Sequence, residues 1–426
     1  MEYKKIVRQN YNIHIINTKR FKTISLNIIF SNDFNKSDIP YLNLLIKNLI
    51  SSTKKYKTSS SLAILGEELY GSSISSSFNI IGNIERMMIS LDFLNPKYTE
   101  KAMIKESIDF LNECLFNPNI INKSFEPHYY DINKNNIING LKSVKDNAYS
   151  YAFINFKNEM YKDNSLSYSL FNNISKIENI TNKKLYDFYL KVINTFKIDV
   201  FLIGNIDSEE EYIRYLDKMF LNENKKFNKK LSLNNELKAL NKKEIKEKSE
   251  FSQSQLFIGY TFKDLTEYEK RYVLSYYNGI LGGINNSLLF SEVRENNSLC
   301  YSIDSFVTKD PYSLVIETEI DKNNYDKVIK IVDKLLKDMS DKNIISPLFN
   351  TTKEYINTSL NNYYDNIGII IDHYYRGEFE EIEDIEIKRE KYSKVTVEDV
   401  IKLSKKIRKN VTYFLEGSIN EKDSIQ

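Results

Sequence analysis

The sequence contains few of the residues that common enzyme sites require. Among 426 residues there are two cysteines, three histidines and no tryptophan. Cys114 and Cys300 lie far apart in the chain, so they cannot form a disulfide framework or a cysteine-type zinc site, and this is typical of a reducing compartment. The histidines, His14, His128 and His373, stand alone in the sequence. A lone histidine is far more often structural or exposed than a metal ligand.

An excess of charge of one sign is also missing. The chain has 60 basic and 58 acidic residues, for a formal charge of +2. This balance argues against a nucleic acid or an anionic membrane surface as a partner. No uncharged apolar run approaches the roughly 20 residues that span a bilayer, and the N-terminus has no apolar signal segment. We therefore expect a cytoplasmic protein without a membrane partner.

The chain is long enough for two packed domains, and its two halves end alike. The segment "FLIGNI" at Phe201–Ile206 resembles "FLEGSI" at Phe414–Ile419. Each follows a helical pattern that opens with a threonine, Thr181 or Thr396, at the position of an N-cap. Each half is therefore predicted to end as a helix, a short turn and a buried strand.

The two halves also begin alike, with β-rich segments at 24–30 and 254–262. We predict an α+β fold of two homologous domains, each a mainly antiparallel sheet with helices packed on one face. The domains are expected at 1–220 and 251–426. The polar, lysine-rich segment 221–250 between them is expected to be a solvated linker, with a basic binding arm as the alternative.

Local signals place several elements of the first half. A helix is predicted to start near Pro40, with Asp38 or Ser37 as its cap. A second helix is predicted over Ser61–Tyr70 and should stop at Gly71. The following segments "SISSSFNII" and "ERMMISLDFL" predict a pair of hairpin strands.

One stretch of the second half, "LLFSEVRENNSLCYS", places Arg294 and Tyr301 at the two ends of a tight junction between a short helix and a strand. A Gly282-Gly283 turn precedes it. A planar guanidinium and a phenolic hydroxyl held there could both donate hydrogen bonds to a peptide carbonyl. The alternative is a surface arginine paired with a neighbouring glutamate, beside a half-buried tyrosine.

The longer segment "ILGGINNSLLFSEVRENNSLCYSIDS" closely resembles the C-terminal-half signature of the insulinase or pitrilysin-like zinc peptidases, which include mitochondrial processing peptidase. That signature has a Leu-Gly-Gly turn, a Leu-Phe-x-x-Val-Arg-Glu helix and a Leu-Ala-Tyr-Ser strand. Ser298 stands where glycine is usual, and Cys300 stands where alanine is usual. The resemblance implies two paired α+β halves that form half of a clamshell, with Arg294 and Tyr301 as substrate contacts.

Active members of that family carry His-x-x-Glu-His on a helix of the first half, which supplies two zinc ligands and the general base. In the corresponding segment, "NLLIKNLISSTKK", Asn43 and Lys47 stand at the histidine positions and Ile46 at the base. The region that should supply the third ligand, 131–145, has no glutamate. The sequence therefore predicts no metal ligand and no catalytic residue in this chain.

The resemblance implies a noncatalytic subunit of a heterodimeric zinc endopeptidase. Its partner would be a homologous subunit with His-x-x-Glu-His and zinc, and Arg294 and Tyr301 would bind the peptide substrate in trans. More narrowly, the chain resembles the metal-free member of a bacterial pair associated with elongation factor P aminopentanol modification. The alternatives are a stand-alone or self-associating peptide-binding scaffold, and an independent enzyme of unknown chemistry.

Two other patterns are better explained by structure than by chemistry. Asp372 and His373 are adjacent, but nothing places a serine or cysteine nucleophile beside them, so helix packing is the better account. The glycines of "LGGIN" lack the strand, helix and downstream acid of a dinucleotide-binding motif, and a turn accounts for them.

Overall fold

The computed structural model describes residues 1–100, 102–220, 230–233, 237 and 242–418. The chain divides into two compact units, which we call unit 1 and unit 2. Unit 1 comprises Met1–Lys142, Leu170–Leu233 and Tyr364–Glu380, and unit 2 comprises Ser143–Ser169, Asn234–Tyr363 and Glu381–Gln426.

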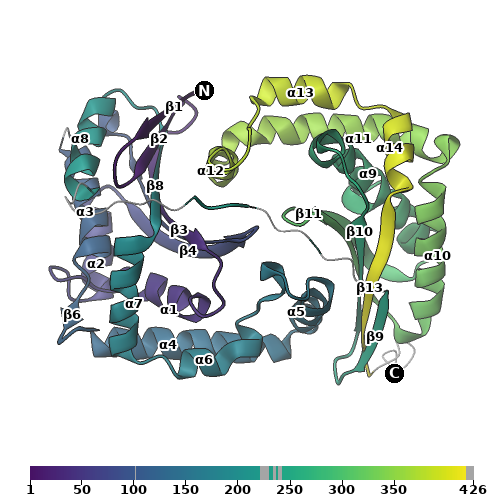
Figure 1. The fold of residues 1–426 in the computed structure, drawn as a ribbon, viewed down its shortest axis with the longest axis horizontal. Helices are drawn as coiled ribbons and strands as arrows, with labels where there is room; N and C mark the ends of the chain where they lie inside the picture. Colours follow the sequence, from purple (N-terminus) through teal and green to yellow (C-terminus); the bar gives the residue numbers. More distant parts are fainter. Residues whose placement is uncertain (101, 221–229, 234–236, 238–241, 419–426) are drawn as a thin grey trace. The chain divides into compact units, whose positions relative to one another are not determined.

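Unit 1 is built on a six-stranded sheet (Figure 1). Its order is β1 (Glu2–Val7), β2 (Asn12–Asn17), β8 (Lys197–Gly204), β3 (Thr23–Asp33), β5 (Ile84–Leu94) and β4 (Ser73–Ile81). All neighbours are antiparallel except β2 and β8, which are parallel. A short hairpin joins β6 (Ile120–Ile121) and β7 (Ser124–Phe125).

Unit 2 repeats this arrangement in a five-stranded sheet. Its order is β11 (Cys300–Thr308), β12 (Ser313–Ile320), β10 (Ser254–Phe262), β13 (Ile407–Glu416) and β9 (Lys243–Lys248). The strands β13 and β9 are parallel, as β8 and β2 are in unit 1. Two α+β units of one topology confirm the predicted fold class. The last part of the expected linker is the strand β9, and most of its other residues lie outside the described part of the chain.

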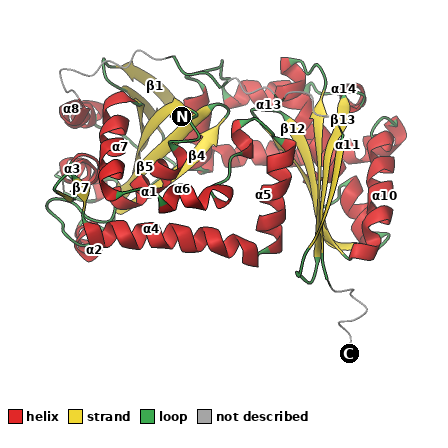
Figure 2. Ribbon diagram, turned by 60° about the horizontal axis from the view of Figure 1, so that its bottom comes forward, coloured by secondary structure: helices red, strands yellow, loops and turns green. Residues whose placement is uncertain are grey.

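Helices cover both sheets (Figure 2). Unit 1 contains α1 (Ile39–Leu49), α2 (Ser59–Glu68), α3 (Met103–Phe116), α4 (Pro127–Lys142), α6 (Ile174–Glu178), α7 (Asn182–Thr195), α8 (Glu209–Phe220) and α12 (Ile367–Arg376). Unit 2 contains α5 (Ala148–Met160), α9 (Leu274–Asn278), α10 (Tyr325–Asp338), α11 (Lys342–Asn362), α13 (Ile385–Ser393) and α14 (Val397–Ser404). In unit 2, α10 and α11 lie on one side of the sheet and α5 on the other.

The pleat of the strands separates an apolar and a polar face in unit 1. On β3, Leu26 and Ile28 point into the main core, while Asn27 and Ser31 point to the other face. Most helices pack on the apolar face, as predicted. The polar face carries α12, whose Tyr375 hydroxyl lies 2.6 Å from the Ser31 hydroxyl.

Each unit therefore contains a helix from the other half of the sequence. α5, from the first half, packs on the sheet of unit 2, and α12, from the second half, packs on the sheet of unit 1. Both helices follow a one-turn 3-10 segment and begin with the same cap, since Asn147 and Asn366 each accept a hydrogen bond from the backbone three residues on. The predicted division into 1–220 and 251–426 places α5 with the first half and α12 with the second, whereas each helix packs in the other unit.

Most of the local expectations hold. Thr181 and Thr396 cap α7 and α14, and the hairpin of β4 and β5 is present. Asp38 occupies the predicted N-cap position of α1, but its backbone is already helical and its side chain makes no cap hydrogen bond. Its carboxylate instead accepts a hydrogen bond from Lys191 Nζ at 2.5 Å.

Candidate functional site

The positions that should hold zinc lie on α1. Asn43 donates to the carbonyl of Ile39 in its own helix at 2.9 Å, so its amide is engaged in the backbone. Ile46 is part of the hydrophobic core, and Lys47 is exposed. The Asn43 amide, which is hydrogen-bonded to its own helix, cannot replace a neutral imidazole as a zinc ligand, and neither can the ammonium group of Lys47.

The neighbouring helix supplies no compensating ligand. α4 contains no glutamate, and Glu126, just before it, accepts a hydrogen bond from the Tyr129 backbone at 3.0 Å. Within the described ranges, the one group of three possible metal ligands lies elsewhere, on the sheet of unit 1. The residues of α1 therefore do not fit a catalytic zinc ion.

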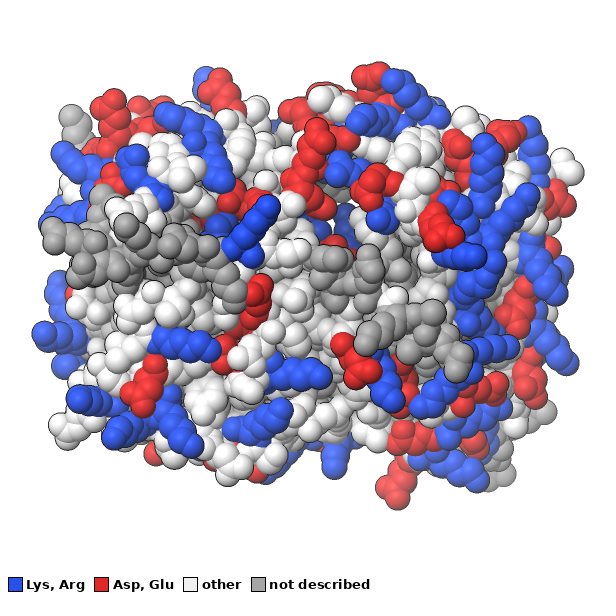
Figure 3. Space-filling model, viewed as in Figure 1, with Lys and Arg blue, Asp and Glu red and all other residues white. Residues whose placement is uncertain are grey.

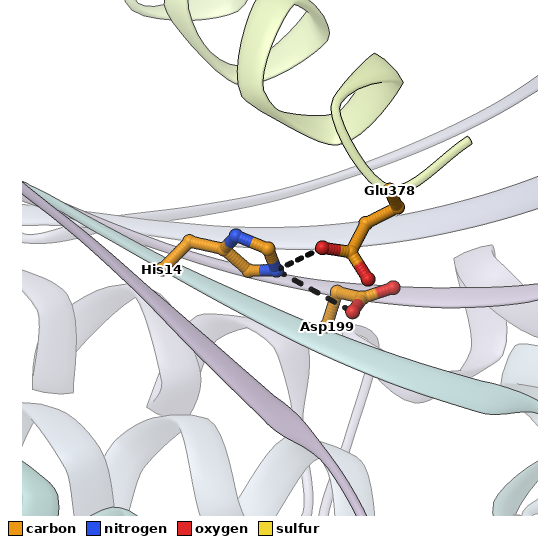
Figure 4. Close-up of side chains that lie close together, drawn as sticks. All are labelled: His14, Asp199 and Glu378. Carbon is orange, nitrogen blue, oxygen red and sulfur yellow. Dashed lines mark hydrogen bonds and ion pairs between the residues drawn. The ribbon is translucent and has the colours of Figure 1, made fainter. Parts of the chain in front are cut away.

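That group consists of His14, Asp199 and Glu378, from β2, β8 and the turn after α12 (Figure 4). His14 Nε2 lies 3.4 Å from Asp199 Oδ1 and 3.8 Å from Glu378 Oε1. The Tyr3 hydroxyl lies 2.9 Å from His14 Nδ1, and the imidazole stacks on Phe201. The expectation that all three histidines stand alone is wrong for His14, because strand pairing and α12 bring distant carboxylates to it.

Two lysines already balance the charge of this group. Lys197 Nζ lies 2.8 Å from an oxygen of Asp199 and 2.8 Å from an oxygen of Glu378. Lys5 Nζ lies 2.6 Å from the other oxygen of Glu378. A divalent cation here would add two positive charges to a buried and already neutral group, which is costly. We interpret His14, Asp199, Glu378, Lys197 and Lys5 as a buried ion network that holds α12 to the sheet.

The network predicts a loss of stability in acid. Burial opposes ionisation of Asp199, but His14 and Lys197 outweigh it and lower the pKa of this carboxyl to about 2. Its contribution is therefore complete above pH ~4 and is lost as the pH falls through ~2, a difference of roughly 2 kcal/mol. The free energy of unfolding in urea should fall less between pH 4 and pH 2 for Asp199→Asn than for the natural chain. In Asp187→Asn, which changes an exposed aspartate, this fall should equal that of the natural chain. An equal fall in all three chains would contradict the stabilising role of the Asp199 carboxylate.

Arg294 and Tyr301 come together on the surface of unit 2. Arg294 lies in a π-helical turn, Phe290–Glu295, and its guanidinium is 4.7 Å from the ring centre of Phe290 and 5.4 Å from that of Tyr301. Tyr301 is 85% exposed, so the expectation of a half-buried tyrosine is wrong. Val293, from the same turn, is fully buried, whereas Phe290 is only half-buried, beneath the guanidinium.

The donors of this pair have no hydrogen-bond partner among the described residues. Within the described residues, no ion pair or side-chain hydrogen bond includes Arg294, and the nearby Glu292 accepts from Asn296 at 2.9 Å. The alternative of a glutamate-paired surface arginine is therefore not what the structure contains. Two rings fix the plane of the guanidinium by cation–π contact and leave its N–H groups for another molecule.

A β-bulge that was not predicted from the sequence positions Tyr301. The pairing of β11 with β12 shifts register between Cys300 and Ile303. Ile303 is buried and Cys300 packs against the same core, so the two residues between them project outward. Bulges re-aim side chains in this way and are common beside functional sites. The departure from glycine at position 298 was the one local hint of unusual backbone here.

Ser298 predicts a stabilising substitution. Its φ is +51°, in the left-handed region that favours glycine. Ser298→Gly should therefore raise the free energy of unfolding by roughly 1 kcal/mol, as measured by urea unfolding. Ser302→Gly, in the adjoining strand, should lower it. A loss of stability in Ser298→Gly would show that the serine side chain compensates for its backbone.

Charges on the surface are mixed. Lys and Arg side chains lie among Asp and Glu side chains over the face shown in Figure 3. No helix of the described part of the chain is long and apolar enough to cross a bilayer.

Known proteins share this fold, and several of them are described as inactive. Residues 179–354 match the peptidase M16 inactive domain. The chain is 26% identical to the probable inactive metalloprotease YmfF of Bacillus subtilis (strain 168), over 95% of each chain. Among solved structures, a conserved protein from Enterococcus faecalis V583 superimposes with a TM-score of 0.89 at 23% identity, covering 98% of this chain and 99% of that one. A peptidase M16 inactive domain from Pseudomonas fluorescens superimposes with a TM-score of 0.77 at 16% identity, covering 99% of both. The chain is therefore similar, in sequence and in fold, to proteins described as inactive homologues of the M16 metallopeptidases.

Proposed function

We propose that this chain is the noncatalytic subunit of a heterodimeric zinc endopeptidase. It would form half of a peptide-binding chamber and supply Arg294 and Tyr301 to a substrate cleaved by a homologous subunit that bears His-x-x-Glu-His and zinc. The observation that carries this proposal is the pair of a half-buried arginine and an exposed tyrosine, whose donors have no partner in the described part of the chain. Its geometry suits a carbonyl oxygen that gains negative charge during cleavage.

The edges of the two sheets support a peptide as the ligand. The edge strands β1 and β9 are rich in charge, with one glutamate and two lysines in β1 and two glutamates and three lysines in β9, which discourages the addition of another strand. The edge strand β4 has no charged residue, and β11 has only Asp304. An extended peptide could therefore pair with β4 or β11 through backbone hydrogen bonds. The pair Arg294–Tyr301 lies at the start of β11.

We also propose a cytoplasmic location for the complex. Cys114 and Cys300 are both free, Cys114 in a helix of unit 1 and Cys300 at the edge strand of unit 2. Free cysteines are usual where thiols are kept reduced. Detection of the tagged chain in the soluble cytoplasmic fraction of its host would test this location.

The proposal is tested by purifying the tagged chain from its own host under gentle conditions. Mass spectrometry should identify an equimolar partner of similar size that bears His-x-x-Glu-His, and the sample should contain about one zinc ion per pair. A species made only of this chain, without zinc, would contradict the proposal and favour a self-associating peptide-binding scaffold.

A further inference from the structure

The helix α5 has two distinct flanks on the sheet of unit 2. Ala152, Phe156 and Met160 face the sheet and pack in its core. On one flank, Glu159 accepts from Lys243 of the edge strand β9 at 2.5 Å. A helical residue four positions on returns to the same side, so residues 153 and 157 share the opposite flank.

That opposite flank faces the edge strand β11. The ring of Phe153 lies 6.3 Å from the ring of Phe306 on β11 and 5.5 Å from that of Phe257 on β10. Near the start of the helix, the Tyr149 hydroxyl donates to Glu317 on β12 at 2.9 Å. A peptide added alongside β11 would therefore meet the flank formed by Phe153 and Lys157.

Lys157 is a cation without a counter-ion. Its Nζ lies 5.7 Å from the ring centre of Phe153, and in the described ranges it takes part in no ion pair or side-chain hydrogen bond. The side chain is half-buried, and burial lowers the pKa of its ammonium group. A carboxylate would accept a hydrogen bond from this ammonium group and offset the cost of removing its charge from water.

The spacing on the helix matches the spacing on a strand. Four residues of α-helix rise about 6 Å, which separates Phe153 from Lys157 along the axis. Two residues of β-strand rise about 6.6 Å and return to the same face. One residue of an extended peptide can thus lie opposite the Phe153 ring while the residue two positions away lies opposite the Lys157 ammonium group.

We propose that the flank of α5 formed by Phe153 and Lys157 is a specificity site for an extended peptide on β11, which recognises an aromatic or large apolar residue and an acidic residue two positions away. This inference rests on the proposed function in one respect, the use of the β11 edge by a peptide. Asp304 and Glu317 face each other across β11 and β12 on the same side of the sheet. They repel an acidic residue from the Tyr149 end of the flank, so the acidic residue fits only at Lys157.

The test is peptide binding to the purified chain without partner or zinc. The probes are four fluorescein-labelled peptides. Two are acidic: Ser-Val-Ser-Phe-Ser-Glu-Ser-Val, and the same peptide with Phe and Glu exchanged. The other two, their glutamine twins, have Gln in place of Glu. One of the two acidic orders should bind roughly tenfold or more tightly than its glutamine twin, because the twin keeps an acceptor oxygen but loses the negative charge that pairs with the ammonium group. Anisotropy titration measures this ratio.

Variants of Lys157 test whether this residue causes the preference for the acidic peptide over its glutamine twin. Lys157→Met should remove it, Lys157→Arg should retain it, and the exposed Lys162→Met should leave it unchanged. Equal binding of acidic and glutamine peptides in both orders, or a preference that persists in a folded Lys157→Met chain, would overturn the proposal. This assay needs no second subunit, so its failure is distinct from a failure to find a zinc-bearing partner.

Discussion

Replacing Arg294 by alanine is expected to lower peptide cleavage by the mixed complex by roughly 10²–10³-fold in kcat, because loss of one preorganised donor to a developing oxyanion has this effect. The two rings around Arg294 hold its guanidinium in place before any ligand arrives, so little ordering remains to be done on binding. Steady-state kinetics of the complex with the zinc-bearing subunit, on a peptide that it cleaves, would measure the change.

Three controls separate this role from folding or assembly. Size-exclusion chromatography and zinc content of the Arg294→Ala complex should equal those of the natural complex. Arg389→Ala removes a half-buried arginine of unit 2 that pairs with Glu386 and donates to Asn361, and should leave cleavage unchanged. Tyr301→Phe removes one neutral hydroxyl and should cost about tenfold or less. An intact Arg294→Ala complex with unchanged kcat would end the proposed trans role.

The elements that were predictable depend on local chemistry. The caps Thr181 and Thr396 and the hairpin of β4 and β5 follow from side-chain hydrogen bonds and two-residue alternation within short segments. Asp38 failed as a cap because a long-range partner, Lys191, takes its carboxylate. Local propensity gives way where a tertiary contact is stronger.

The exchanged helices and the ion network were not predictable in this way, because they join residues far apart in the chain. Two weak signals existed. Asp-Asn occurs at 146–147 and again at 365–366, each time after a long helix, and marks the two exchanged helices as equivalents. His14 and Asp199 are polar residues inside otherwise apolar strands, and a buried charge must find a partner somewhere in the fold.

Lys197→Met should lower the free energy of unfolding by roughly 3–5 kcal/mol, because it removes one partner of a buried ion pair and leaves charge uncompensated. The Asp199 and Glu378 side chains are 0% and 7% exposed, so water cannot take the place of the lysine. Urea unfolding at neutral pH would measure the loss. Lys105→Met breaks an exposed pair with Asp109 and should change stability by less than about 1 kcal/mol.

A double variant and a metal titration test whether charge is the cause. Glu378→Gln in the Lys197→Met background removes one of the two facing negative charges, and should recover part of the lost stability even though it removes a further hydrogen-bonding partner. Zinc should leave the unfolding midpoint of the natural chain unchanged, because Lys197 and Lys5 already occupy the carboxylate oxygens. A zinc-dependent rise in that midpoint would instead make His14, Asp199 and Glu378 a metal site, since a ligand that binds only the folded state stabilises it.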